Sequence, residues 1–514
     1  MALTTAVSLN GEDLTPADVW SVAVEGGRAE FDQGARARMV AARELVEDTA
    51  GRDGEHTYGI NTGFGRFVER TIPPELSEEL QLRLLRSHAC GVGEPYPDEV
   101  VRAAMLLRAN TLAKGYSGAR VETVELLIEC LNHGVIPVVP SRGSVGASGD
   151  LAPLAHLALP LVGEGCATVD GERHSGAEAL ARVDLEPIRL GAKEGLSLIN
   201  GTQFMSATGS LVLVRAERLA KAADIACSLS VEALQGSRVS FRPEIHALRP
   251  LPGQATSAAN IRRLLDGSAI IESHRWCDKV QDAYSLRCAP QVHGACRDLL
   301  DYARNTIAVE LNAATDNPLV FVETGELVSN GNFHGQPLAF ALDAAAMAVA
   351  ELASISERRV ERLTNPSLSD GLPAFLTHDG GLNSGFMIPQ YVAASLVSEN
   401  KVLAHPASVD SIPTSAGQED HVSMGNAAAL TCWQVVANSE RALAIELLAA
   451  AQGVEFLAPL EPGAGVRAAH DAVRALSAQL VDDRPLAPDI ERVAAAIGSG
   501  ELTAAVEAEV GELT

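Results

Sequence analysis

The chain has 514 residues, so it is long enough to bury a large core and to form more than one structural unit. Its formal net charge of −26 argues against binding to a nucleic-acid backbone or an anionic membrane, and indicates an acidic, solvated surface. Hydrophobic residues make up 47% of the chain and aromatic residues only 4%; much of the apolar content is Ala and Leu, which favours helices.

Several features predict a soluble cytoplasmic protein. The first residues include Asp and Glu and lack the apolar core of a signal peptide. The apolar stretch at 338–350 has too few residues to span a membrane, and it contains Asp343. The eight cysteines have no paired spacing, which fits reduced thiols better than a disulfide framework or a zinc site. The thirteen histidines show no HExxH pattern, so no metal is predicted.

Helical spacing of apolar residues dominates the chain. The ranges with this spacing are 97–112, 121–132, 204–230, 296–314, 337–363 and 425–451. Residues 137–140 read as extended chain, and 161–190 contain short β-branched runs between Gly and charged residues, which predicts a small hairpin. With no internal repeat or low-complexity linker visible, we expect a mainly α protein with one interwoven helical body.

The first candidate functional segment, residues 58–65, reads Tyr-Gly-Ile-Asn-Thr-Gly-Phe-Gly. Composition alone favours a flexible turn here. A phosphate cradle is disfavoured, because no Lys-Ser/Thr pair follows at P-loop spacing.

Residues 143–150 read Gly-Ser-Val-Gly-Ala-Ser-Gly-Asp and contain an Ala-Ser-Gly tripeptide that can form an electrophile. Attack of the Gly149 amide nitrogen on the Ala147 carbonyl carbon, with loss of water, closes an imidazolone ring. Loss of a second water from Ser148 leaves an exocyclic methylidene. Glycine leaves its nitrogen unobstructed and tolerates the compressed backbone. The alternative is an ordinary turn that leads into a helix capped by Asp150.

Later segments place polar groups at informative spacings. Gln281, Tyr284 and Arg287 are three apart, so a helix there would put all three on one face, although a polar surface face is the simpler interpretation of Gln281. Asn200 precedes a glycine and alone reads as a turn residue. Phe333, taken singly, reads as core.

The thirteen residues from 143 to 155, Gly-Ser-Val-Gly-Ala-Ser-Gly-Asp-Leu-Ala-Pro-Leu-Ala, resemble the signature of the aromatic amino acid ammonia-lyases. Further segments match this family from about Tyr58 to His421. The resemblance implies a fumarase/aspartase-like bundle of long central helices and a homotetramer. It divides the chain into a smaller N-terminal region, 1–200, and a bundle with C-terminal helices, 201–514. It also implies a 4-methylidene-imidazol-5-one formed autocatalytically from Ala147-Ser148-Gly149, with no external cofactor.

The resemblance assigns roles to individual residues. It makes Tyr58 a catalytic tyrosine on a mobile lid and Arg287 the clamp for the substrate carboxylate, a task that suits a planar bidentate guanidinium. The remaining assignments are Tyr284 and Gln281 beside the imidazolone, Asn200 next to the electrophile, Asn312 in carboxylate binding, and Phe333 against the reacting group.

Two positions bear on the substrate. His88 stands where phenylalanine-specific relatives usually have an aromatic residue, but it does not separate histidine from tyrosine, because tyrosine lyases also have His there, usually followed by Leu. Here Ala89 follows, as in the histidine-specific branch. Glu419, in Gln-Glu-Asp-His-Val-Ser-Met (418–424), resembles that branch too: a carboxylate can bind an imidazole, whereas facing a phenyl ring it would be buried without a partner. The resemblance thus implies deamination of L-histidine to trans-urocanate and ammonia, the first step of histidine degradation.

Several alternatives remain open. The residues do not decide whether the substrate amine or its imidazole reacts with the electrophile, or whether Tyr58 or Glu419 removes the β-proton. A tyrosine or phenylalanine ammonia-lyase or an aminomutase on the same scaffold is the nearest rival. A non-catalytic helical assembly protein that keeps the loop as a relic is the rival from another class.

Overall fold

The computed structural model describes residues 6–50, 57, 59, 60, 62, 63, 67, 69, 70 and 72–514. The chain forms two compact units, each assembled from three stretches of sequence. Unit 1 comprises Met1–Leu211, Arg304–Leu342 and Pro406–Leu430, and unit 2 comprises Val212–Ala303, Asp343–His405 and Thr431–Thr514. The boundary predicted after residue 200 falls inside the first stretch of unit 1.

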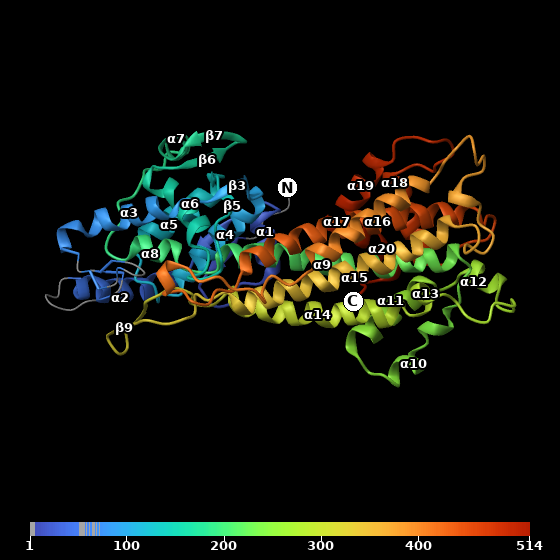
Figure 1. The fold of residues 1–514 in the computed structure, drawn as a ribbon, viewed down its shortest axis with the longest axis horizontal. Helices are drawn as coiled ribbons and strands as arrows, with labels where there is room; N and C mark the ends of the chain where they lie inside the picture. The colour runs from blue at the N-terminus through green and yellow to red at the C-terminus, as the bar shows by residue number, and fades with distance from the viewer. Residues whose placement is uncertain are drawn as a thin grey trace. The chain divides into compact units, whose positions relative to one another are not determined.

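Unit 1 combines short helices with small sheets (Figure 1). Two capping boxes mark helix starts in this unit, Thr15–Asp18 at α1 and Ser175–Glu178 at α7. The helices within this unit are α1 (Pro16–Ala23), α2 (Gln33–Ala50), η2 (Pro74–Leu76), α3 (Ser77–His88), α4 (Asp98–Ala113), α5 (Val121–Asn132), α6 (Leu151–Ala158), η3 (Leu159–Val162), α7 (Gly176–Ala181), α8 (Glu194–Ile199) and η6 (Ser415–Gly417).

The strands of unit 1 pair in short sheets of two or three. A parallel pair joins β1 (Val7–Leu9) to β2 (Ala29–Phe31), and antiparallel pairs join β3 (Val92–Pro95) to β5 (Pro140–Arg142) and β8 (Leu319–Phe321) to β9 (Glu326–Val328). The antiparallel order β4–β6–β7 joins Ile136–Pro137, Cys166–Val169 and Glu172–Ser175. The predicted hairpin within 161–190 and the extended chain at 137–140 are therefore confirmed.

Unit 2 is helical in its described elements. They are η4 (Arg238–Phe241), α10 (Pro243–Ala247), α11 (Pro252–Leu264), α12 (Ala269–Ser273), α13 (Tyr284–Arg287), η5 (Ala374–Leu376), α16 (Met387–Leu403), α18 (Ala464–Leu476), α19 (Ala487–Ser499) and α20 (Glu501–Val510).

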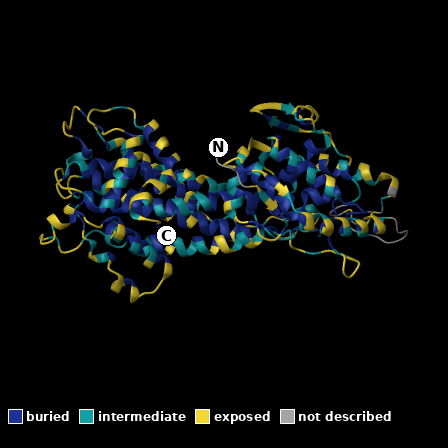
Figure 2. Cartoon of the chain, turned by 180° about the vertical axis from the view of Figure 1, so that it is seen from behind, coloured by how far each residue is buried: buried dark blue, intermediate teal, exposed yellow. Residues whose placement is uncertain are grey.

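Four long helices have residues in both units: α9 (Gln203–Ala233), α14 (Ala289–Glu310), α15 (Gln336–Thr364) and α17 (Gly425–Glu455). Their buried residues run along most of their length (Figure 2). The mainly α class and the six predicted helices are confirmed. These helices form because Ala-rich sequences with apolar residues at three- and four-residue spacing can bury several faces of a helix. Among the described residues, α15 alone is long and apolar enough to cross a membrane, and 72% of its apolar window is buried, as in a core helix.

The segment around Gln281, Tyr284 and Arg287 is helical only in part. α13 covers Tyr284–Arg287, and Gln281 lies in the irregular segment before it, so the three residues do not share one helix face. That segment is held by contacts to other parts of unit 2 instead. Asp282 accepts the Ser237 amide at 2.7 Å, and the Lys279 ammonium donates to the carbonyls of residues 234 and 235, each at 3.1 Å.

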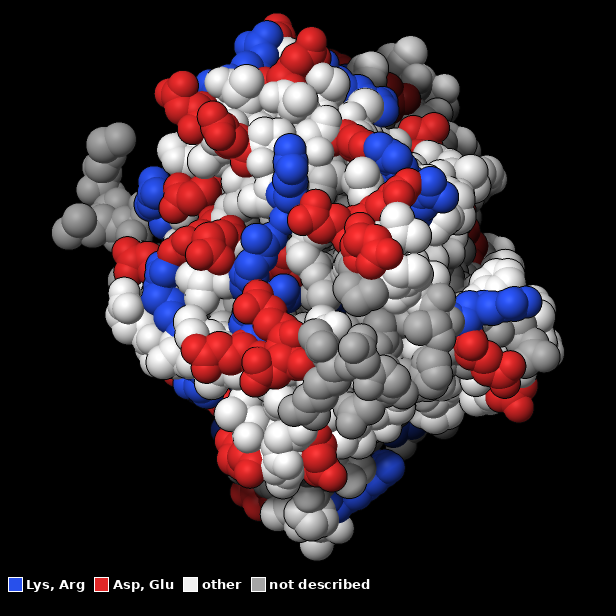
Figure 3. All heavy atoms as spheres, turned by 90° about the vertical axis from the view of Figure 1, so that its left-hand side faces the viewer, with Lys and Arg blue, Asp and Glu red and all other residues white. Residues whose placement is uncertain are grey.

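The acidic surface predicted from the net charge is a mixed one. On the face drawn in Figure 3, basic side chains lie among acidic ones, and some of the acidic side chains adjoin one another. These charged side chains are exposed to solvent on this face, which agrees with the solvated surface expected from the net charge.

Candidate active site

Residues 143–150 form a loop whose backbone bends sharply. Gly146, Ser148 and Gly149 have positive φ angles of 72°, 52° and 67°. This left-handed region costs an L residue about 1–2 kcal/mol, so Ser148 stays there only because its surroundings hold it. Ala147 is 6% exposed and Gly149 is buried. The tripeptide predicted to cyclise is compact and largely shielded from solvent.

Gly149 has no room for a side chain. A Cβ there would lie 1.9 Å from the carbonyl oxygen of Gly201. The two glycines form a parallel β-bridge, and the Asp150 amide donates to the same Gly201 carbonyl at 2.7 Å. Space and backbone conformation together therefore require glycine at the position whose nitrogen is predicted to close the ring.

Segments far away in the sequence hold the first half of the loop. The Gly335 amide donates to the Gly146 carbonyl at 3.2 Å, and the Met424 amide donates to the Val145 carbonyl at 2.9 Å. These bonds bring the segments around residues 331–335 and 419–424 to the loop.

Asp150 supports the loop from within the core. It is fully buried, and its carboxylate accepts the Ser144 hydroxyl and the Met205 amide, each at 2.9 Å. Burial raises its pKa to about 6 despite these two donors. Asp150 precedes α6 as expected, but its side chain makes no capping hydrogen bond, because the carboxylate is committed to the loop and to α9.

Asn200 lies directly at the tripeptide. It follows α8 and is 2% exposed. In the orientation that satisfies both polar atoms of its amide, the nitrogen donates to the Ser148 carbonyl at 3.0 Å and the oxygen accepts the Asn317 amide at 2.7 Å. Asn200 is thus a donor aimed at an oxygen of the residue predicted to become the electrophile.

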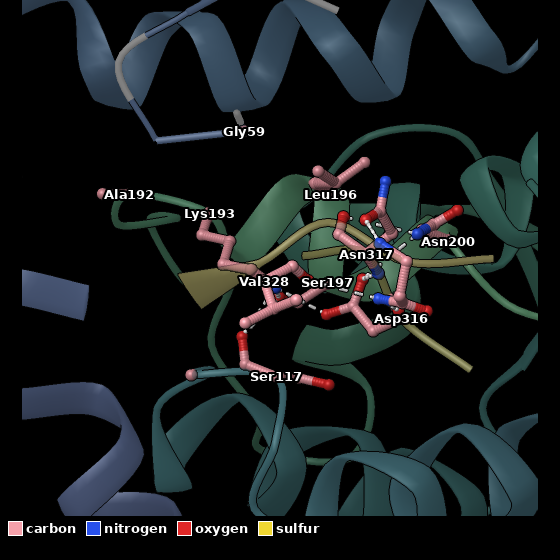
Figure 4. A network of polar contacts seen from close by, with 12 residues as sticks. Gly59, Ser117, Ala192, Lys193, Leu196, Ser197, Asn200, Asp316, Asn317 and Val328 are labelled. Atoms are coloured by element: carbon pink, nitrogen blue, oxygen red, sulfur yellow. Dashed lines mark hydrogen bonds and ion pairs between the residues drawn. The ribbon is translucent and has the colours of Figure 1, made fainter. Parts of the chain in front are cut away.

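A buried ionic network underlies Asn200 (Figure 4). The Lys193 ammonium is 2.6 Å from Asp316 and donates to the Ser117 carbonyl at 2.9 Å; both charged side chains are fully buried. Arg108, also fully buried, donates to the Asn200 carbonyl at 3.0 Å. Burial by itself would raise the pKa of Asp316, but Lys193 and Arg108 bring that pKa below its ordinary value. The pair stays ionised and fixes the turn that presents Asn200.

Sequence reasoning did not single out Lys193, Arg108 or Asp316 as site-supporting residues. A usable signal was present for Arg108, because it is the one charged residue in the stretch Ala103–Ala113 of α4, which is otherwise mostly apolar and is buried throughout. A charge in such a helix must have buried partners. Nothing local, however, identifies those partners.

His88 and Glu419, the two residues predicted to select the substrate, lie in the same unit. The charge of Glu419 affects the pKa of His88. Burial lowers the pKa of His88, against opposing effects from the Leu84 carbonyl and the charge of Glu419. Nδ1 of His88 is 2.9 Å from the Leu84 carbonyl, so it carries the proton and Nε2 is left as an acceptor. The Thr414 hydroxyl donates to Oε2 of Glu419 at 2.6 Å. Both side chains are half-buried.

Phe333 and Asn312 have different surroundings. Phe333 is half-buried and lies two residues before Gly335, which binds the loop. Asn312 pairs with the backbone of Leu14: its Oδ1 accepts the Leu14 amide and its Nδ2 donates to the Leu14 carbonyl, both at 2.9 Å. Its role in carboxylate binding stays a prediction that these contacts do not support, because both ends of the amide anchor the N-terminal segment.

Tyr58 lies outside the described residues. Its neighbour Gly59 packs on α8, since a Cβ at Gly59 would lie 2.5 Å from Cδ2 of Leu196, and Figure 4 shows the two close together. Nε2 of the buried Gln81 is 3.5 Å from the Gly59 carbonyl. This end of the glycine-rich segment therefore packs against the helix that leads to Asn200.

The remaining predicted residues, Gln281, Tyr284 and Arg287, form a cluster in unit 2. Nη2 of Arg287 donates to Oε1 of Gln281 at 3.0 Å, and the guanidinium lies over the Tyr284 ring, 4.6 Å from its centroid. Nε of Arg287 is buried without a hydrogen-bond partner among the described residues. Tyr284 is 71% exposed. The cluster thus offers an unsatisfied cationic donor beside an exposed phenol.

Comparisons with known proteins show the family of the chain. The family model described as aromatic amino acid lyase matches residues 14–475. The chain is 58% identical to a histidine ammonia-lyase of Gloeobacter violaceus over 99% of both chains, and 56% identical to one of Symbiobacterium thermophilum over 98% of this chain and 99% of that one.

Solved structures show the same fold. The structure of histidine ammonia-lyase from Trypanosoma cruzi matches with a TM-score of 0.91 and 46% identity, over 98% of this chain and 96% of that one. Tyrosine aminomutase from Streptomyces globisporus matches with a TM-score of 0.94 and 40% identity, over 99% and 100%. The fold is thus shared by proteins with different reactions, and sequence identity is higher to the histidine lyases.

Proposed function

The chain belongs to the aromatic amino acid lyase family, and from that premise we propose how its residues eliminate ammonia from L-histidine. Its activity is that of a carbon–nitrogen lyase acting on histidine, the activity that names its relatives at 50–58% identity over nearly the whole chain. Elimination of the amino group with a β-proton leaves the unsaturated acid trans-urocanate and needs no oxidant.

The observation that carries the proposal is the Ala147–Gly149 tripeptide. It is bent into the left-handed region at Ser148 and Gly149, has no space for a Cβ at Gly149, and receives a hydrogen bond from Asn200. These features fit a 4-methylidene-imidazol-5-one made from this tripeptide. Such a group supplies an electrophilic carbon and an electron sink that ordinary side chains lack. Asn200, Gly201 and Asp150 would hold it in place.

Glu419 and His88 are the residues that we assign to the imidazole ring of the substrate. The carboxylate of Glu419 has one oxygen held by Thr414 and accepts an imidazole N–H with the other. His88, kept neutral by burial and with Nδ1 committed to Leu84, offers Nε2 as an alternative acceptor for that N–H. Neither group suits an unsubstituted phenyl ring, because each would then be buried beside it without a partner. Phe333 packs beside the ring.

Arg287 binds the substrate carboxylate in this proposal. Its unsatisfied Nε and its planar guanidinium match a carboxylate, and Gln281 and Tyr284 fix the orientation of that guanidinium. We assign removal of the β-proton to Tyr58, because one oxygen of Glu419 is already held and the other is needed for the ring.

We also propose that the protein works as a homotetramer in the cytoplasm. The exposed Tyr284 and Trp276, 71% and 88% accessible in a single chain, support contact between copies, so that a site can use segments of more than one copy. The eight cysteines are free thiols, a state that a reducing cytoplasm maintains.

A substrate panel followed by ultraviolet absorbance tests the activity. The purified protein should form urocanate from histidine, and coumarate without urocanate on a panel of histidine, tyrosine and phenylalanine would contradict the assignment. Intact mass tests the electrophile separately, since the mature chain should be lighter than the encoded one by two waters. Ser148→Ala should keep fold and assembly but lose turnover; loss of assembly in that variant would indicate that the loop has only a structural role.

A further inference from the structure

The helix that carries Tyr284 and Arg287 is too short to hold itself. α13 spans four residues, and within it only Leu286 is buried. An isolated helix of one turn is unstable, because several backbone dihedrals are fixed for very few hydrogen bonds. Its N-cap residue, Ala283, makes no side-chain hydrogen bond. The position of Arg287 must therefore depend on contacts from outside α13.

Arg359 makes such a contact. This residue of α15 is fully buried, and its Nη1 donates to the Ser285 carbonyl at 3.3 Å. Ser285 lies between Tyr284 and Arg287, and its carbonyl is among the last of α13, which an isolated helix leaves without a donor. The guanidinium thus satisfies the backbone of the turn that carries the proposed carboxylate clamp.

Arg359 is itself held rigidly. Glu446 of α17 accepts from both Nε and Nη2, the latter at 2.8 Å, and also accepts the Ser230 hydroxyl of α9 at 2.7 Å. Both members of the ion pair are fully buried. A buried bidentate pair with further hydrogen bonds has one well-defined geometry, which suits a fixed anchor.

A second set of contacts comes from α14. Nη1 of Arg359 faces Nε2 of the fully buried His293 at 3.4 Å, and Nδ1 of that histidine is 2.8 Å from Asp224. Because a guanidinium only donates, Nε2 is the acceptor and Nδ1 carries the proton, so His293 is neutral. Burial is the largest effect on the pKa of His293 and lowers it, in agreement with the neutral form. Arg359 is therefore fixed by three long helices and contacts α13.

We propose that Arg359 is a positioning residue for the substrate-binding turn: through the Ser285 carbonyl it sets where Arg287 meets the substrate carboxylate. This inference rests on the proposed function, since it needs Arg287 to bind that carboxylate. Arg359 touches neither substrate nor reacting atoms in this role, and its effect is selective for ligands that carry a carboxylate.

The first test is hydrogen exchange in the full-length, assembled protein. In Arg359→Lys, the single ammonium can remain on Glu446 but cannot also span to Ser285, so the amides of Arg287 and Cys288, which close α13, should exchange about tenfold faster. Arg215→Lys is the matched control: Arg215 forms a bidentate pair with Glu440, at 2.9 and 2.6 Å, and this pair also joins α9 to α17. It should leave these amides unchanged.

The second test compares two inhibitors of histidine turnover. Imidazole-4-propionate has the ring and carboxylate, whereas histamine has the ring and amine. Arg359→Lys should weaken inhibition by imidazole-4-propionate about tenfold, leave inhibition by histamine within twofold, and raise KM for histidine more than it lowers kcat. Arg215→Lys should change none of these values.

The outcomes separate this inference from the proposed function. Unchanged exchange at Arg287 and Cys288, or an equal loss for both inhibitors, would overturn the positioning role. Faster exchange with no change for either inhibitor supports the anchoring of α13 and contradicts the carboxylate role of Arg287. If Arg359→Lys does not assemble, Glu446→Asp keeps the charge pair while drawing the guanidinium back from Ser285, and the same readings apply.

Discussion

Replacing Gly149 by Ala tests whether the loop geometry is required by the structure. The new Cβ would lie 1.9 Å from the Gly201 carbonyl oxygen, whereas ordinary contact begins near 3.4 Å, so one of the two backbones must move by about 1.5 Å. The φ of +67° adds a conformational penalty for any L side chain.

The magnitude follows from three effects on the free energy of unfolding. The left-handed conformation costs alanine about 1–2 kcal/mol. Displacing the Gly201 carbonyl weakens its 2.7 Å hydrogen bond from Asp150, which removes about 0.5–1.5 kcal/mol. Residual overlap adds to both. We therefore expect Gly149→Ala to lower the stability of unit 1 by roughly 2–4 kcal/mol and to abolish turnover, since ring closure needs this nitrogen unobstructed.

Gly134→Ala is the matched control, because Gly134 has a φ of +71° and a Cβ added there would meet nothing within 4 Å. It should lose only the conformational part, about 1–2 kcal/mol, and keep activity. Both substitutions are compared by denaturant unfolding at one protein concentration in a Ser148→Ala background, where the methylidene cannot form. Equal destabilisation by the two alanines, or an active Gly149→Ala enzyme in the wild-type background, would refute the reasoning.

Three further substitutions test the buried residues Asp150 and Lys193 and the half-buried Glu419. Asp150 has a folded pKa of about 6 against 3.8 for the free group, so the folded state binds the extra proton and stability should fall by about 2 kcal/mol as pH rises from 4 to 6; in Asp150→Asn this slope, measured by urea unfolding, should vanish. Lys193→Met leaves Asp316 buried without its cation and should cost about 3–5 kcal/mol in the same assay, and a loss below about 1 kcal/mol would show that the pair is not needed. Glu419→Gln should raise KM for histidine about tenfold or more, the value of a charge-assisted hydrogen bond, and an unchanged KM in steady-state kinetics would remove Glu419 from ring binding.

The parts of the fold that the sequence predicted are those with a local signal. Ala-rich helices such as α15 show their period directly, and the glycines around Ser148 show where the backbone must be compressed. Spacing alone could not show whether Gln281 shares a helix with Tyr284, because its neighbours Asp282 and Lys279 bind the Ser237 amide and the 234–235 carbonyls, which are remote in sequence. Such partners leave no local trace.

The same reason explains the supporting groups that sequence reasoning missed. Lys193 and Asp316 are 123 positions apart, so neither residue reveals the other. Asp150 was recognised as a possible cap, a role that its position alone suggests, while its actual hydrogen-bond donors became visible only in the folded chain. The family resemblance identified residues that are expected to contact the substrate. It did not identify the buried residues that position them.

The depth at which these groups lie has an evolutionary consequence. Lys193 and Asp150 are fully inaccessible and Asn200 is 2% accessible, whereas His88 and Glu419 retain partial contact with solvent. Inherited changes at the first three should threaten folding before they alter chemistry, while changes at the last two should be tolerated by the scaffold and, in the site that we propose, alter which amino acid is accepted. When proteins with this fold evolve to accept new substrates, substitutions should therefore accumulate at solvent-accessible positions such as His88 and Glu419. The fully buried positions should change little.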